Sequence, residues 1–202
     1  MLYKIASLLA ATAAVELNEI TDDFQQDAHE IWDSFMEKEE DVFDWFEIDN
    51  STIKSVNGGT IHFLNVTTLN WLDETKQVGP NGNSLWTHHV AINIPKNLKY
   101  PGIANALVTD KCNEHDASLP DAREENMLVS DELAHLSQMI TITIFQIPNC
   151  HIVYPSDPSQ MSRHEDAVIA WAWRQFHEDP SNFEWLPRLP MAKASFLVMK
   201  AA

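Results

Sequence analysis

The sequence predicts an α/β fold in which an antiparallel start is followed by parallel βα units. Residues 86–94 alternate between two faces, with Trp86 and Val90 on one and Thr87 on the other, and this period of two is typical of a half-buried strand. After Pro101, short apolar runs alternate with helical patterns. Strands that alternate with helices form parallel sheets with right-handed crossovers, so the second half predicts helices on both faces of a sheet.

The first elements are strands at residues 60–69 and 86–94. Gly58-Gly59 is a turn pair before the first strand, which is rich in Thr, Val and Ile, and the loop at residues 80–83 separates the two. These segments predict an antiparallel meander at the start of the sheet.

The later elements follow in the order strand, helix, strand, helix. We expect strands at 103–108 and 139–147 and a helix at 122–137 between them. Ser162 is expected to cap the next helix, with Glu165 three residues later completing a capping box. Asp179-Pro180 ends that helix, and a last helix begins at Pro190.

The N-terminus predicts a secretory signal peptide at residues 1–14. Lys4 precedes a short apolar run that ends in small residues, and a run of about ten residues is too short to cross a bilayer. An N-terminal amphipathic helix is the alternative. Residues 15–45 are expected to form an acidic helical leader, with disorder of residues 16–26 as an equal alternative, and residues 46–202 to form an incomplete α/β domain.

The composition limits the classes of partner that we expect. A formal net charge of −17 with scattered Lys and Arg excludes nucleic acid as an expected partner, because phosphate binding needs clustered cations. No membrane insertion is expected after signal cleavage. We expect a secreted, extracellular protein whose partner is an unidentified extracellular protein or receptor.

Two cysteines and two sequons fit an oxidising compartment. Cys112 and Cys150 each follow a predicted parallel strand, so both are expected at the carboxyl edge of the sheet, either as a disulfide or as two free thiols. Asn50 and Asn65 begin Asn-x-Ser/Thr triplets and are candidate N-glycosylation sites in a eukaryotic host.

Three blocks of sequence resemble the PhoPQ-activated pathogenicity-related family, in its eukaryotic branch. They are residues 146–158, 163–173 and 185–194, and weaker likeness upstream extends the resemblance over about residues 42–202. The resemblance implies a secreted protein with an α/β-hydrolase-like domain similar to dipeptidyl peptidases. In that family a serine lies in a Gly-x-Ser-Lys-Arg-Gly-Trp type motif after the next strand, and this chain has no such motif.

No catalytic, cofactor-binding or metal-binding residue is nominated, and no cofactor is expected. None of the five glycines forms a Gly-x-Ser-x-Gly elbow. The loop at residues 109–113 lies where such folds supply an oxyanion amide, but we interpret it as a surface loop. His88 and His89 point to opposite faces of a strand and cannot chelate one ion together. His151 and His164 are interpreted as turn and cap residues.

Three functions remain open. The first is a secreted regulatory protein, truncated before the nucleophile and non-catalytic over these residues; the second is the N-terminal part of a secreted serine hydrolase; the third is a non-functional truncated product. If a central strand is missing, Val108, Ile142 and Ile144 are expected to lose cover, and the 202-residue product is expected to be poorly soluble or partly unfolded.

Overall fold

The computed structural model describes residues 28–113 and 118–202, and it divides the chain into two compact units, Met1–Glu39 and Glu40–Ala202. In the first unit the described part is a helix over residues 28–37. The expected signal peptide and residues 16–26 lie outside the described residues.

The second unit is built on one sheet. Its strands are β1 (Asp44–Glu47), β2 (Ile53–Lys54), β3 (Thr60–Asn70), β4 (Leu85–Ile94), β5 (Tyr100–Val108) and β6 (Met139–Ile144). The order across the sheet is β1-β3-β4-β6-β5, and β2 also pairs with β3. Strands β5 and β6 are parallel, whereas the other pairs are antiparallel. The predicted antiparallel start is confirmed, and of the predicted parallel βα units the described residues contain one, β5 and β6 with the helix between them.

The two long early strands agree with their sequence prediction to within one residue, but other boundaries differ. Strand β6 ends at Ile144 rather than at residue 147, because Gln146 takes a left-handed φ of 67° that leaves the sheet direction. Strand β1 begins at Asp44, so the end of the segment expected to be a helical leader is already part of the sheet.

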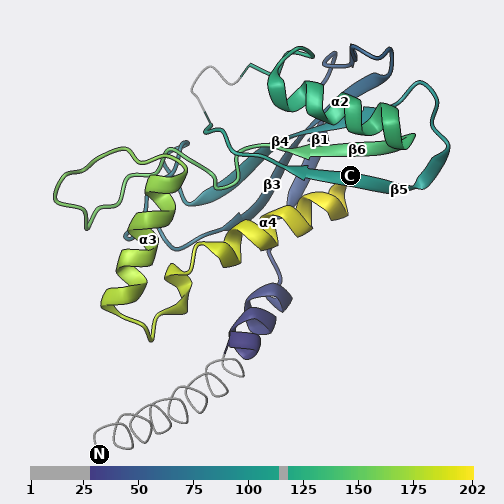
Figure 1. The fold of residues 1–202 in the computed structure, drawn as a ribbon. Helices are drawn as coiled ribbons and strands as arrows, with labels where there is room; N and C mark the ends of the chain where they lie inside the picture. Colours follow the sequence, from purple (N-terminus) through teal and green to yellow (C-terminus); the bar gives the residue numbers. More distant parts are fainter. Residues whose placement is uncertain (1–27, 114–117) are drawn as a thin grey trace, which may run out of the picture. The chain divides into compact units, whose positions relative to one another are not determined.

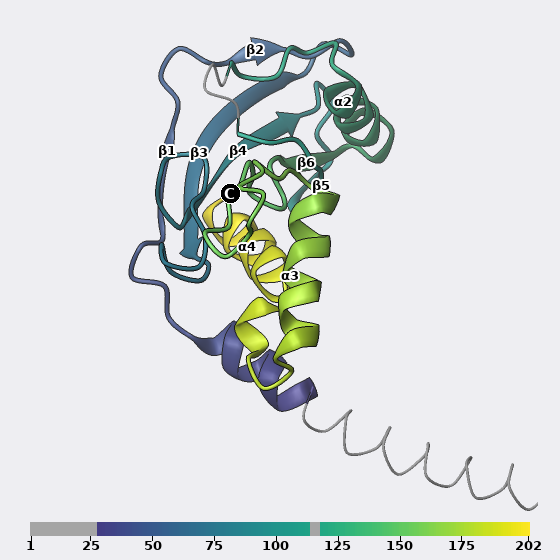
Figure 2. The same ribbon diagram turned by 90° about the vertical axis from the view of Figure 1, so that its left-hand side faces the viewer.

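Helices cover both faces of the sheet (Figure 1). They are α2 (Glu125–Ser137), α3 (Asp166–Glu178), the 3-10 turn η1 (Phe183–Trp185) and α4 (Arg188–Ala201). Helix α2 lies against β6 and β4 on one face, and α4 lies against β3 and β6 on the other. Figure 2 shows α3 and α4 together on the face opposite α2.

The predicted start of α3 is wrong. The helix begins at Asp166, its N-cap position is Glu165, and no side chain caps its first turn. Ser162 lies in the preceding loop, where the neighbouring Arg163 binds Asp157 through Nε and Nη2 at 3.1 and 2.6 Å. The backbone of Arg163 also pairs with that of Ile152 in an antiparallel bridge, so residue 163 is extended and the helix cannot begin directly after Ser162. Helix α4 also begins earlier than expected, at Arg188, so Pro190 is its third residue.

The core has two parts, one on each face of the sheet. The larger lies under α3 and α4 and includes the buried Trp71, Trp86, Trp171 and Trp185, whereas Trp173 is exposed. Each large aromatic ring buried in this way contributes about 2–3 kcal/mol. The smaller part lies under α2 and is formed by Ile61, Phe63, Ala91, Met127 and Phe145.

Among the described residues, β5 and not β6 lies at the open edge of the parallel part of the sheet. Ile103 and Val108 are 61% and 47% exposed, as expected for Val108. The expectation that Ile142 and Ile144 lose cover is wrong, because β6 lies between β4 and β5 and both side chains are buried. Within the described residues, no helix has the length and apolar character needed to cross a bilayer.

Candidate functional site

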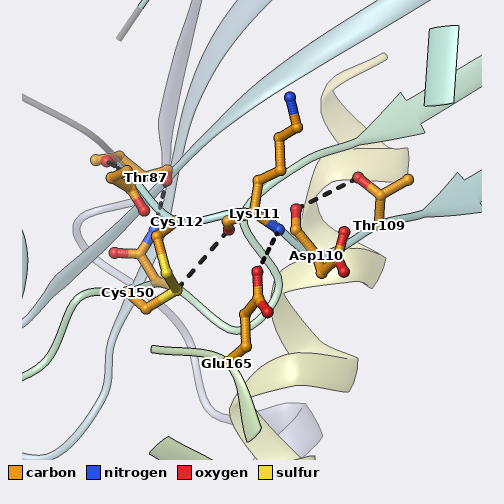
Figure 3. Close-up of a disulfide and its surroundings, with 9 residues drawn as sticks. Thr87, Thr109, Asp110, Lys111, Cys112, Cys150 and Glu165 are labelled. Atoms are coloured by element: carbon orange, nitrogen blue, oxygen red, sulfur yellow. Dashed lines mark hydrogen bonds between the residues drawn. A yellow bond between two sulfur atoms is a disulfide. The ribbon is translucent and has the colours of Figure 1, made fainter. Parts of the chain in front are cut away.

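A disulfide joins the two loops that follow the parallel strands. Cys112 follows β5 and Cys150 follows β6, and the structure links their sulfur atoms with the Cα atoms 4.6 Å apart (Figure 3). The Asn113 N–H also donates to the Cys150 carbonyl at 2.6 Å. The two strand ends are thus fixed to each other at the carboxyl edge of the sheet.

A cavity of about 490 Å³ opens beside this disulfide. Its walls come from β4, from the loops after β5 and β6, from residues 118–124 and from the start of α3. The lining residues are His89, Lys111, Cys112, Ser118, Leu119, Pro120, Asp121, Glu124, Phe145, Gln146, His151, His164 and Glu165. A hollow of this size fits a small ligand or a short peptide segment.

The loop at residues 109–113 lies at the surface, as predicted, with Asp110 and Lys111 exposed, and it also forms part of the cavity wall. Thr109 N–H donates to the Ile144 carbonyl at 2.8 Å, and the Lys111 N–H donates to Glu165 Oε1 at 3.2 Å (Figure 3). Because the Asn113 amide is bonded to Cys150, neither the Lys111 nor the Asn113 N–H is free to receive an oxyanion.

Three residues that line the cavity have a strained backbone. Lys111, Gln146 and Glu165 have φ values of 76°, 67° and 43°, a region that side-chain-bearing residues rarely adopt. Each is held in place by contacts from elsewhere in the chain; for example, Gln146 N–H donates to the Asp110 carbonyl and Gln146 Oε1 accepts the His89 N–H at 2.6 Å. Strained residues of this kind collect at binding and catalytic sites.

The histidines divide into a core group and a cavity group. His88 is fully buried, and burial lowers its pKa to about 4, so its ring is neutral; it bonds Thr68 Oγ1 at 3.1 Å and the Phe145 carbonyl. His89 faces the other way, lines the cavity, and has a pKa lowered by burial. Because Thr68 is also fully buried, its contact with His88 is a core hydrogen bond and not a nucleophile–base pair.

His151 and His164 also line the cavity, with ring centroids 5.6 Å apart. Their place in the cavity wall could not be predicted from the sequence, because the two rings meet only after the loop between them folds back. Among the described residues, no three His, Cys, Asp or Glu side chains are placed to hold a metal ion.

The two sequons differ in their surroundings. Asn50 is exposed at a turn, with a φ of 56°, whereas Asn65 is half-buried in the middle of β3, where Phe46 of β1 and His89 of β4 are its neighbours. An acceptor in the turn is accessible in the folded protein, and one in mid-sheet is far less so.

The fold is a mixed α/β fold with a cavity beside the disulfide, at the carboxyl edge of its parallel strands. The chain belongs to the PhoPQ-activated pathogenicity-related protein family, because the sequence model of that family matches residues 33–202. It is also similar to autocrine proliferation repressor protein A of Dictyostelium discoideum, with 29% identity over 170 residues, which is 84% of this chain and 31% of that protein. The chain therefore spans about a third of that relative's length. No solved structure matches it.

Proposed function

We propose that this chain is the N-terminal part of a secreted, α/β-hydrolase-like regulatory protein that acts by binding an extracellular protein or receptor. Three observations support the proposal: the family membership, the similarity to a relative named as a proliferation repressor, and the sequence pattern of a signal peptide. The cavity of about 490 Å³ at the sheet edge is the observation that carries the binding role, because a pocket with converging polar groups is the default binding site of such a fold.

The hydrolase-like part of the proposal rests on the open edge of the sheet. Strand β5 is parallel to β6, and no other strand within residues 28–113 and 118–202 pairs with its outer side. A further strand that followed α4 through a right-handed crossover would pair there, and the turn after it would lie at the carboxyl edge, beside the cavity. That turn is where the family resemblance locates its serine.

The binding role is tested with mature protein on the cells that produce it. We expect saturable binding to the cell surface, slower proliferation, and a mature N-terminus after Ala13 or Ala14. His164→Ala, which changes an exposed residue of the cavity, should weaken binding, and His177→Ala, on the exposed surface of α3, serves as the matched control. Binding that is not saturable, or that both variants weaken equally, contradicts the proposal.

Catalysis is the second candidate. It predicts that a longer natural transcript encodes a strand and a Gly-x-Ser turn after Ala202, and that the longer product hydrolyses activated esters or peptide amides. Replacement of that serine by alanine should abolish hydrolysis and leave cell binding unchanged. Loss of both activities together would instead indicate that the site binds and reacts with one substrate.

A further inference from the structure

The leucines of helix α2 lie on its outer face, away from the sheet. The face that packs on the sheet carries residues spaced three, four and seven apart, namely Met127, Ser130, Asp131 and Ala134. The face that points away from the sheet carries Val129, Leu133 and Leu136, which are 45%, 40% and 72% exposed, with Leu128 beside them. A surface helix normally buries its leucines, so the outer face is an apolar stripe without cover among the described residues.

Polar anchoring on the inner face keeps the leucines outside. Asp131 is buried, its Oδ2 accepts the Asn57 N–H at 2.7 Å, and its Oδ1 accepts Asn93 Nδ2 at 3.4 Å. Rotation of α2 to bury Leu133 would break both bonds and leave the Asn57 amide unpaired. Because a buried polar group that loses its partner is costly, these two bonds fix the orientation of α2.

Ionisable side chains lie near both ends of α2. Glu125 is exposed in its first turn, and His135 is exposed in its last turn. Lys99, also exposed, lies at the same end as His135, because its N–H donates to the carbonyl of Gln138, the C-cap of the helix. The apolar stripe of α2 thus has Glu125 at one end and Lys99 at the other, and the exposed Glu132, whose Oε2 accepts Asn57 Nδ2, lies beside Leu133.

We propose that the outer face of α2 packs against the same face of a second copy of the chain, with the two helices antiparallel about a two-fold axis. In that arrangement the stripe of Val129, Leu133 and Leu136 covers itself, and Glu125 of one protomer lies near Lys99 of its partner. Self-complementary patches of this kind form isologous dimers. The acidic surface disfavours an anionic lipid bilayer as the occupant, since bilayer docking relies on clustered cations.

The oligomeric state of the whole chain, measured by sedimentation equilibrium, tests the proposal. We expect a monomer–dimer equilibrium with a Kd in the micromolar range, as for interfaces of modest area. Leu133→Glu with Leu136→Glu should raise the Kd at least about 100-fold, because two charges on each side would be buried against each other. Phe196→Glu is the matched control: it adds a charge to an exposed apolar residue of α4, on the other face of the sheet, and should leave the Kd unchanged.

Exchanging the charges of Glu125 and Lys99 tests the proposed ion pair between protomers directly. Glu125→Lys or Lys99→Glu alone should raise the Kd by about three- to tenfold, and the two changes together should restore it, because each ion pair then re-forms with reversed sign. Circular dichroism and the Tm check that each variant is folded.

The open edge of β5 offers a competing interface, which Ile103→Lys separates from the proposed one. A lysine on an edge strand blocks strand-to-strand association, so Ile103→Lys should leave an α2-mediated dimer intact. A chain that is monomeric at about 200 µM, a dimer that Ile103→Lys abolishes, or a charge exchange that fails to restore the Kd each overturns the proposal.

Discussion

The Lys193 ammonium lies 2.6 Å from Glu40 Oε1, and both side chains are almost fully buried, at 2% and 8% exposure. Lys193 belongs to α4, and Glu40 precedes β1, so the pair joins the two ends of the second unit. A buried ion pair stabilises little compared with an apolar replacement, but the loss of one partner is costly because a charge remains buried.

Lys193→Met is therefore expected to lower the free energy of unfolding by about 3–5 kcal/mol, measured by urea titration. The double variant Glu40→Leu with Lys193→Met removes both charges and should recover most of that loss. A double variant as unstable as the single one would show that Lys193 acts through packing and not through its charge.

The disulfide is a second source of stability. Cys112 and Cys150 are 38 residues apart in the sequence. Closing a loop of that length lowers the entropy of the unfolded chain, which predicts about 4 kcal/mol of stabilisation. The Cys112→Ser with Cys150→Ser variant should lose about that amount, and a reducing agent should have the same effect on the parent protein and none on the variant. Thiol titration of the denatured, unreduced protein is expected to find no free sulfhydryl; two would contradict the pairing.

His88 makes stability depend on pH. Its folded-state pKa is about 4 because burial disfavours the charged ring, whereas the unfolded chain takes up a proton at its ordinary value of 6.5. Between these values the unfolded state binds more protons, so the free energy of unfolding falls as the pH drops from about 6.5 to about 4, by up to about 3 kcal/mol.

The comparison with His88→Gln isolates this effect. The variant loses the bond to the Phe145 carbonyl or to Thr68 and is less stable at pH 7, but its free energy of unfolding should change less between pH 6.5 and pH 4. Parallel pH profiles for the two proteins would show that His88 is not the group that titrates.

Some of this structure could be predicted from sequence because its determinants are local. The alternation along residues 86–94 specified β4, and Asp179-Pro180 correctly marked the end of α3. The start of α3 could not be found in the same way, because it depends on a non-local pairing: the backbone of Arg163 bonds to that of Ile152 and keeps residue 163 extended.

The cavity and the orientation of α2 are the parts that sequence could not show. His89, Gln146, His151 and His164 converge from three separate segments, and only the sheet order brings them together. In α2, the leucines fit a helical period equally well whether they face inward or outward, and the choice is made by the distant amides of Asn57 and Asn93 on Asp131.

The sequons give the last prediction. In a eukaryotic secretory host, Asn50 is expected to carry a glycan at high occupancy, since it is exposed in a turn, and Asn65 at low occupancy, since it lies between two strands. Glycopeptide mass spectrometry measures both occupancies directly. Asn50→Gln should remove most of the mass shift that a glycosidase produces, and Asn65→Gln should leave it nearly unchanged. Equal occupancy at the two positions would mean that glycans are added before β3 pairs with its neighbours, so that folding around Asn65 is slower than transfer of the glycan.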